Sequence, residues 1–396
     1  MKKDCFYLPE GMIYLDGNSL GPMPLTAADR VQQTVSGEWK ELLITGWNKA
    51  GWYQQPRVLG DRLAPIIGAP AGSVVIGDTL SIKVYQALAS ALQMRPERNV
   101  ILSDTGNFPT DLYIAEGLIK SFDRGGKLKL ELKVVEPESV ADHLDENVAV
   151  MMLTHVDYRT GRMHDMADLT RKAQDNGTVA LWDLAHSAGA LPVHLTACNA
   201  EFAVGCTYKY LNAGPGSPAF IYVRPDIANT VEPALSGWMG HREPFAFEQH
   251  YDAAPAIERM RIGTAPVLQM AALDAALDVW DDVSITDVRK KSIELSECFI
   301  EEVEKRCPQL TLLSPRDSAQ RGSQVSFTFD EGYAVIQALI AQGVVGDFRA
   351  PNVLRFGFTP LYLDIDDMVR AAEILEDIMA NRTWDTPSFK QRAAVT

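Results

Sequence analysis

The chain has few cysteines, no long apolar run and a deficit of positive charge. Its five cysteines are scattered, odd in number and without close pairs, which argues against a disulfide framework or a zinc knuckle. No stretch is long and apolar enough for a membrane span or a signal peptide, so we expect a cytoplasmic protein without a bound metal. The net charge of −15 argues against nucleic acid or an anionic membrane as a partner.

What remains is the composition of a globular chain of 396 residues, 46% of them hydrophobic. Seven short apolar runs alternate with amphipathic segments as far as about Thr264. Such alternation is typical of a mostly parallel sheet covered on both faces. We therefore predict an α/β fold with a mostly parallel seven-stranded sheet in a large domain. The expected strands are Val74–Ile76, Val100–Leu102, Leu130–Val135, Val148–Leu153, Val179–Trp182, Phe202–Gly205 and Ala219–Val223.

Helical patterns separate these strands, and the pattern changes after them. Beyond residue 266 two longer helical stretches precede short strands and two further helices, which predicts a smaller α+β C-terminal domain over 267–396 after a large domain over 31–266. The expected helices are Ser81–Gln93, Thr110–Phe122, Met166–Asp175, Val267–Val279, Asp287–Arg306, Tyr333–Gln342 and Ile365–Ile378, and the short strands are Leu310–Leu313 and Gln324–Phe329.

A carboxylate and an amine follow two of the expected strands. Asp183 ends one apolar run, and Lys209 follows the next, 26 residues later. Ligands of parallel sheets bind beyond the carboxyl ends of the strands, so we expect both side chains in one site. They suit pyridoxal phosphate (PLP), because the amine can bind the cofactor and the carboxylate can hold a proton on the pyridine nitrogen. The ordinary alternatives are a solvated lysine and a helix-capping aspartate, but His186 three residues after Asp183 favours PLP.

Three further segments are candidates for the same site. The helix start at Ser81 offers amides and a hydroxyl to a phosphate, although it could equally be an unoccupied cap. Phe108 could stack on a pyridine ring or lie in the core. Arg355, in an apolar context, needs an anionic partner, which could be the α-carboxylate of an amino-acid substrate or a structural carboxylate.

Seven segments carry a resemblance that spans almost the whole chain: YLDGNSLG, NFPTDLYIAEGL, LTHVDYRTG, WDLAHSAGA, GCTYKYLNAGPGS, LSGWMGH and LRFGFTPLY. Together they resemble the class V group of fold-type I PLP enzymes, and within it the kynureninase family. The resemblance implies the fold-type I PLP-dependent transferase fold, with residues 1–30 as an N-terminal arm that packs on the small domain. It also implies hydrolytic cleavage of the Cβ–Cγ bond of L-kynurenine to anthranilate and L-alanine, a step of tryptophan catabolism in the kynurenine pathway that leads to NAD biosynthesis.

The same resemblance implies roles for individual residues. Lys209 would carry PLP, Asp183 would pair with the pyridine nitrogen, and Tyr208 would move protons. Arg355 would bind the substrate carboxylate. Two of the residues, Trp238 and Thr264, would come from the neighbouring subunit of a homodimer with shared active sites. The remaining implied contacts are His186, Phe108, Pro109, Thr110 and Asp111 around the ring, Leu80, Ser81, Tyr208 and Trp238 at the phosphate, and Trp47 and Ser19 in the aryl pocket.

Two departures from the family pattern are visible. Ala213 replaces a glycine common in the turn after the lysine, and Thr264 stands where some relatives have asparagine. Threonine is too short to replace an amide that could bond a 3-hydroxyl group, so we expect weaker use of 3-hydroxykynurenine than of kynurenine.

Two other classes of function are the alternatives. A cysteine desulfurase or selenocysteine lyase needs a nucleophilic cysteine on a small-domain loop, and the candidate loop over 314–324 contains none. Tyr208 also stands where desulfurases carry histidine. A nucleotide-linked oxidoreductase would need a Gly-x-Gly-x-x-Gly loop, which is missing, and a non-catalytic α/β binding protein would need no cofactor.

Overall fold

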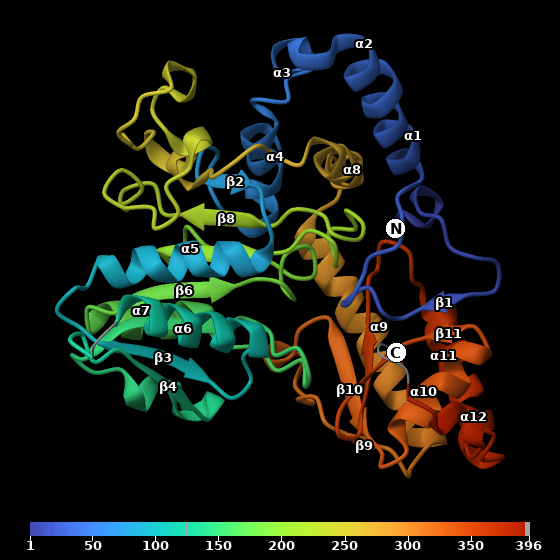
Figure 1. The fold of residues 1–396 in the computed structure, drawn as a ribbon. Helices are drawn as coiled ribbons and strands as arrows, with labels where there is room; N and C mark the ends of the chain where they lie inside the picture. The colour runs from blue at the N-terminus through green and yellow to red at the C-terminus, as the bar shows by residue number, and fades with distance from the viewer. Residues whose placement is uncertain (124–125, 393–396) are drawn as a thin grey trace.

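The computed structural model describes residues 1–123 and 126–392. A seven-stranded sheet lies on one side of the molecule and a smaller unit from the C-terminal part lies on the other (Figure 1). All seven expected strands are present, which confirms the α/β fold. In spatial order they are β2 (Val74–Ile76), β8 (Phe220–Val223), β7 (Phe202–Gly205), β6 (Val179–Asp183), β5 (Val148–Thr154), β3 (Val100–Asp104) and β4 (Glu131–Val135).

The sheet is mostly parallel and buried on both faces. Strands β7, β6, β5, β3 and β4 run in one direction, and β8 is antiparallel to β7 and β2. Alternate residues of β5 enter two different cores, with Val150 and Met152 in one and Met151 and Leu153 in the other. Because both faces are covered, the strand reads as one continuous apolar run, and this is why the sequence pattern located it.

The helices of the large domain fall where the sequence places them, except at the N-terminal end. Helices α5 (Leu80–Gln93), α6 (Pro109–Phe122) and α7 (Met166–Asp175) match the expected ones. None of the described helices is long and apolar enough to cross a membrane. The sequence pattern missed four helices before β2. They are α1 (Leu25–Gln33), α2 (Lys40–Leu42), α3 (Gly46–Lys49) and α4 (Gln55–Leu63).

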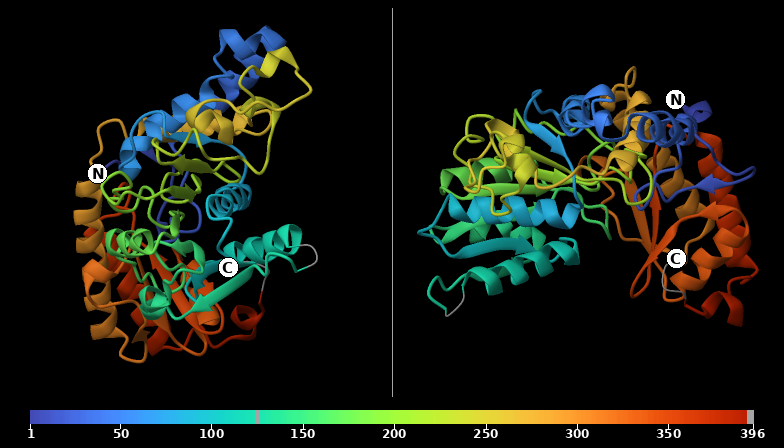
Figure 2. Two further views of the ribbon diagram at one scale, coloured as in Figure 1. Left: turned by 90° about the vertical axis from the view of Figure 1, so that its left-hand side faces the viewer. Right: turned by 45° about the horizontal axis from the view of Figure 1, so that its top comes forward.

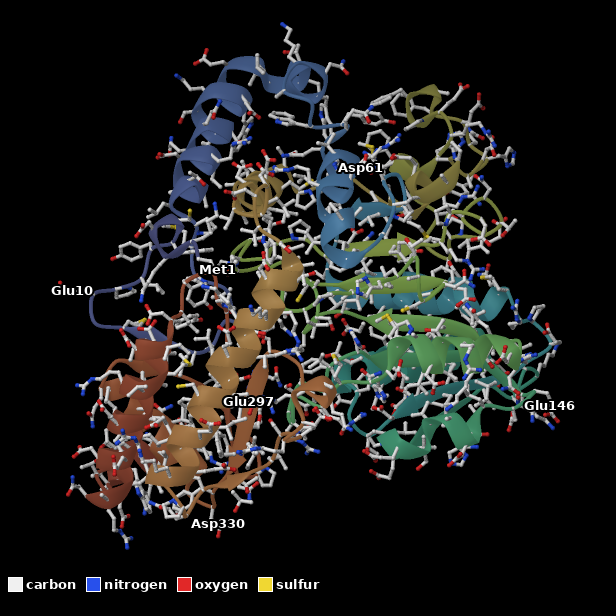
Figure 3. The ribbon with its side chains drawn as sticks, turned by 180° about the vertical axis from the view of Figure 1, so that it is seen from behind. Met1, Glu10, Asp61, Glu146, Glu297 and Asp330 are labelled. Carbon is white, nitrogen blue, oxygen red and sulfur yellow. The ribbon has the colours of Figure 1, made fainter. Side chains whose placement is uncertain are left out.

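The C-terminal part forms a second, antiparallel sheet of four strands in the order β12, β13, β10 and β9. Helix α9 runs along the side of this part nearer the large sheet, where Glu297 marks it from behind (Figure 3). Phe299 of α9 packs against Phe327, Phe356 and Phe358. The bounds are α8 (Val267–Asp278), α9 (Ile285–Arg306), β9 (Thr311–Leu312), β10 (Gln324–Thr328), α10 (Gly332–Ala341), β12 (Asp347–Arg349), β13 (Val353–Gly357), α11 (Ile365–Ala380) and α12 (Pro387–Lys390).

The N-terminal segment joins the two parts of the molecule. Strand β1 (Ile13–Tyr14) pairs in parallel with β11 (Val344–Val345), and the Gly21 amide donates to the Tyr208 carbonyl at 2.8 Å. A Cβ atom at Gly21 would lie 2.4 Å from the Lys209 carbonyl oxygen, so only glycine allows this approach. Helix α8, which we assigned to the small domain, packs against α1 and α4. The domain limits stay a prediction.

Candidate active site

Asp183 and Lys209 meet at the carboxyl edge of the large sheet. Strands β6 and β7 are parallel neighbours, with Asp183 opposite Val204, so the residues that follow them emerge side by side. The Lys209 Nζ lies 2.9 Å from the His186 Nε2. The Asp183 Oδ1 accepts a hydrogen bond from the Ala185 amide at 2.7 Å, which fixes the turn between the carboxylate and the histidine.

The environment favours the neutral form of the lysine. Burial lowers the pKa of Lys209, while Cys206 and Asp183 oppose the shift and the two nearby arginines, Arg355 and Arg349, add to it. Burial also lowers the pKa of His186 well below its usual range, and the charge of Lys209 lowers it further. A neutral amine is the form that attacks an aldehyde, so Lys209 is suited to bind PLP.

A second carboxylate faces Asp183. Asp111, in the first turn of α6, is buried, and burial together with Asp183 raises its pKa well above the usual range. Burial raises the pKa of Asp183 as well, whereas the hydrogen bond from Asp111 lowers it. The rise is larger for Asp111, so Asp111 is the member of the pair whose neutral form is more strongly favoured. Within the described residues the Asp111 Oδ2 and the His186 Nδ1 are buried without a hydrogen-bond partner, so polar groups remain for a ligand to satisfy.

Residues suited to the cofactor phosphate lie on a neighbouring segment. Leu80 and Ser81 form the first turn of α5, whose amides are free of intrahelical partners and face an anion favourably. The Thr79 side chain caps the helix at Ile82. Tyr208 is half-buried, and Cys206 and burial raise its pKa, so its phenol stays protonated and able to donate.

The segment before α6 supplies an aromatic wall. Phe108 precedes the helix and is 41% exposed, and its ring contacts that of Tyr158 edge-on with centroids 5.1 Å apart. An exposed ring beside the site can stack on a cofactor, whereas a core phenylalanine would be buried. Pro109 and Thr110 begin α6 and place Asp111 behind Phe108.

Arg355 has a carboxylate partner within the chain. It stands opposite Asp347 in the antiparallel pair β12–β13, and its Nε donates to the Asp347 Oδ1 at 2.8 Å. A second bond joins its Nη2 to Asp347, and the Nη2 also donates to the Ser19 Oγ at 2.7 Å. The Nη1 donates to the Tyr158 carbonyl at 2.5 Å. The structure thus brings Ser19 and Arg355 together beside Lys209 and gives Arg355 the structural ion pair that the sequence left open.

Sequence reasoning missed Arg349, the second arginine on the same carboxylate. Its Nη2 lies 2.6 Å from the Asp347 Oδ2, and its side chain is 34% exposed against 1% for Arg355. Both guanidinium groups interact with this carboxylate, and the charge of Asp16 also raises the pKa of both arginines against the effect of burial. The alternation Asp347-Phe348-Arg349 was the signal for a strand that carries both charges on one face.

Three implied residues are not joined to this site within one chain. No hydrogen bond or ring contact within the described residues joins Trp47, Trp238 or Thr264 to Lys209. Trp47 contacts Trp52 in the N-terminal helices, which lie at the same end of the molecule as the segment around 240–260 (Figure 2). Trp238 is 40% exposed and stacks on the exposed Phe247.

The glycine replacement after Lys209 is compatible with the turn. Asn212 and Gly214 have positive φ angles of 58° and 91°, whereas Ala213 between them is not among the described residues with positive φ. Alanine therefore fits at 213 without backbone strain.

Comparison with known proteins decides the family. Residues 288–375 match the family model of the kynureninase C-terminal domain. Kynureninase of Burkholderia pseudomallei (strain K96243) is 51% identical over 400 residues, covering 100% of this chain and 95% of that protein. The chain belongs to the kynureninase family. Kynureninase of Pseudomonas fluorescens is 49% identical over 397 residues, covering 99% of this chain and 95% of the relative.

Solved structures with the same fold are more distant. A C-DES mutant with glycine covalently linked to its PLP cofactor matches with a TM-score of 0.80 at 17% identity, over 95% of this chain and 99% of the other. A cysteine desulfurase from Thermococcus onnurineus NA1 matches with a TM-score of 0.79 at 18% identity, over 96% and 97%. At these identities the structural similarity confirms the fold but gives no evidence about the activity. The chain is an enzyme of the kynureninase family with the fold of PLP-dependent enzymes.

Proposed function

We propose that this enzyme hydrolyses the Cβ–Cγ bond of L-kynurenine to anthranilate and L-alanine with PLP bound at Lys209. The observation that carries this is a half-buried lysine with a lowered pKa and a buried aspartate at one sheet edge, beside two arginines that share one carboxylate. The test is to add L-kynurenine to the PLP-loaded protein and measure both products. Sulfide released from cysteine without anthranilate from kynurenine would overturn the proposal.

The chain's own residues supply binding and proton transfer. When bound, PLP would draw electrons from the substrate α-carbon, and Asp183 would hold the charge on the pyridine nitrogen. The Lys209 Nζ, whose pKa burial lowers, would take the proton from the α-carbon. The Tyr208 phenol would donate to the phosphate and return a proton to the alanine product at Cβ. Phe108 would stack on one side of the ring.

Arg355 and Arg349 hold the substrate carboxylate. The Ser19 hydroxyl donates to the Asp347 Oδ2 at 2.7 Å and so has no hydrogen left for an anion, and its place in the aryl pocket stays a prediction. Arg355 is fixed by Asp347 and the Tyr158 carbonyl, so it presents a rigid edge to the substrate. The Arg349 side chain is more exposed than that of Arg355, and only its Nη2 bonds to Asp347. It therefore has N–H donors left for an incoming anion.

Arg349→Gln should raise KM for L-kynurenine by about tenfold with kcat largely retained. Loss of one charged hydrogen bond to the carboxylate weakens ground-state and transition-state binding alike. Steady-state kinetics on the PLP-loaded enzyme measure the two constants separately. Arg316→Gln is the matched control, because Arg316 is an exposed small-domain arginine paired with Glu304 at 2.6 Å. An unchanged KM in Arg349→Gln would remove Arg349 from the carboxylate site.

A homodimer would complete the site. Trp238 and the exposed Thr264 lie on the surface of one chain, where a partner's site can use them. The aromatic side chains of Phe245 and Phe247 surround Trp238 and are also exposed, as expected of a surface that another subunit covers.

Subunit mixing tests this arrangement. A Trp238→Ala chain and a Lys209→Ala chain should each be impaired alone. After exchange in equal amounts they should regain about a quarter of wild-type activity, because half of the dimers carry one intact composite site. Recovery is measured as anthranilate release after the exchange has been verified by mass. No recovery would place Trp238 and Lys209 in the same subunit's site.

Other predictions stand beside the proposal. The cytoplasmic location, the role of Trp47 in the aryl pocket and the weaker use of 3-hydroxykynurenine through Thr264 stay predictions. The preference for kynurenine over 3-hydroxykynurenine is measured by comparing kcat/KM for the two substrates.

A further inference from the structure

A second cavity of about 580 Å³ lies between the two domains and shares no lining residue with the site around Lys209. From the large domain, the start of α7 and the loop after His186 line it. From the small domain, α9 and the turn before β10 close it. The lining residues that matter here are His155, Met166, Leu191, Cys198, Arg289 and Gln320.

Arg289 places a positive charge without a counter-ion in this wall. Its guanidinium donates to the carbonyls of Ser318, Arg321 and Gly322 at 2.5, 2.7 and 3.2 Å. Within the described part of the chain no carboxylate lies within ion-pair distance of it. Burial, and after it the charge of Arg321, lowers the pKa of Arg289 to about 10. Backbone carbonyls offset part of the desolvation cost, but the charge itself is unpaired, and an anion in the cavity would be stabilised there.

His155 adds an unsatisfied polar group to the same wall. It is 5% exposed, and its Nδ1 is buried without a hydrogen-bond partner in the described residues. Burial lowers the pKa of His155 to about 3, so the ring is neutral and can donate one hydrogen bond or accept one. The Nδ1 has almost no accessible surface of its own, so it adds an unsatisfied polar atom behind the wall and is not itself exposed to the cavity.

The rest of the wall is largely apolar. Met163, Met166, Leu191, Pro192 and Val193 face the same space. The Asp165 carboxylate also lines the cavity, and it caps α7 by accepting a hydrogen bond from the Asp168 amide. Burial raises the pKa of Cys198, and the charge of Asp165 raises it further. The histidines His164 and His194 also line the cavity. The wall therefore combines the Arg289 guanidinium with polar side chains, the Asp165 carboxylate and an apolar surface, and this apolar surface suits a carboxylate with an apolar body better than an inorganic anion.

We propose that this cavity is a binding site for a small monocarboxylate with an apolar body, whose carboxylate contacts Arg289 and whose ring or chain lies against the methionine and leucine side chains. Such a ligand bridges the two domains. The wall of the cavity is also linked to the active site by one backbone hydrogen bond, which the His155 amide donates to the Asp183 carbonyl at 2.9 Å. The site is independent of the proposed reaction, and neither Arg289 nor Cys198 belongs to the machinery around Lys209.

Benzoate is the probe, and Cys198 reports on it. Cys198 lines the cavity and is partly accessible, whereas Cys298 is partly accessible on α9 and does not line it. For a small ligand we expect a Kd on the order of 1 mM. About 10 mM benzoate should then slow methanethiosulfonate labelling of Cys198 in the PLP-loaded enzyme roughly tenfold, because about a tenth of the sites stay free. Labelling of Cys298 should not change. Peptide mass spectrometry gives both rates.

Two variants separate binding from misfolding. Arg289→Gln should abolish protection of Cys198, and Ala167→Trp should do the same by filling the cavity while the bonds from Arg289 to the turn remain. Arg316→Gln should keep full protection. Protection that persists in Arg289→Gln and Ala167→Trp, equal protection by acetate, or no protection in the wild-type enzyme would each overturn the proposal. Labelling needs no turnover, so a failure here is distinct from a failure of the kynurenine reaction.

Discussion

Lys209→Ala should lose both the covalently bound cofactor and all measurable turnover. Lys209 is the amine at the carboxyl edge of the sheet, 2.9 Å from His186 and with a pKa that burial lowers. Lys83, which is buried, cannot replace it. Its Nζ is held by Asp78 and Gln86 at 2.9 Å each and by the Met260 carbonyl at 3.2 Å. Without the Lys209 amine, neither the covalent attachment nor the removal of the α-proton has a group to perform it.

Borohydride reduction followed by peptide mass spectrometry measures the attachment directly. The wild-type protein should carry the reduced cofactor on the peptide that contains Lys209, and the variant should carry none. Lys120→Ala, a change in the last turn of α6, is the control and should keep both cofactor and activity. A reduced adduct on any other lysine of the Lys209→Ala protein would show that the attachment site is elsewhere.

The core of this site could be predicted from the sequence because it depends on strand ends. Fully buried parallel strands read as continuous apolar runs, and the residues that follow them share one edge of the sheet. Asp183 and Lys209 follow two such runs, β6 and β7, so their proximity required only the strand assignment. Ser81 was a candidate because it lies at a helix start, whereas a place for Asp111 in the site was implied by the family resemblance alone.

The carboxylate-binding side could not be predicted in the same way, because it depends on cross-strand register. Arg355 meets Asp347 through the antiparallel pairing of β12 and β13, two strands that the apolar pattern did not reveal. The short β12 contains two charged residues of three, so it carries almost no apolar signal. Arg349 lies on β12, and the sequence analysis missed it because it missed that strand.

The N-terminal helices were missed for a related reason. Helix α1 is polar on average and buries only Ala27 among its nine residues, so it offers few apolar residues by which to recognise it. Position 47 lies in another of these short helices and packs on Trp52. In the homodimer that we propose, its place relative to the aryl pocket depends on how the two chains assemble, and no pattern within one sequence contains that information.

Asp183→Asn should keep the fold and the bound cofactor but slow turnover on the order of 100-fold or more. The side-chain oxygen of asparagine can still accept the hydrogen bond that the Ala185 amide donates at 2.7 Å, so the turn to His186 is retained. The negative charge is lost, and with it the group that would stabilise a proton on the pyridine nitrogen. Fixed charges aimed at a reacting group are among the largest contributions to catalysis, and they act most strongly in a buried site such as this one.

The neighbouring Asp111 makes the result informative. Burial and Asp183 together keep Asp111 neutral, so removal of the charge at 183 lowers the pKa of Asp111 toward its usual range. Asp111 could then supply part of the missing charge. The double variant Asp183→Asn with Asp111→Asn should therefore be slower than Asp183→Asn alone, whereas Asp226→Asn on the surface should have no effect. The measurements are kcat, the visible spectrum of the bound cofactor and Tm for each variant. Near-normal kcat in the double variant, with cofactor bound and Tm unchanged, would show that neither carboxylate holds the ring nitrogen.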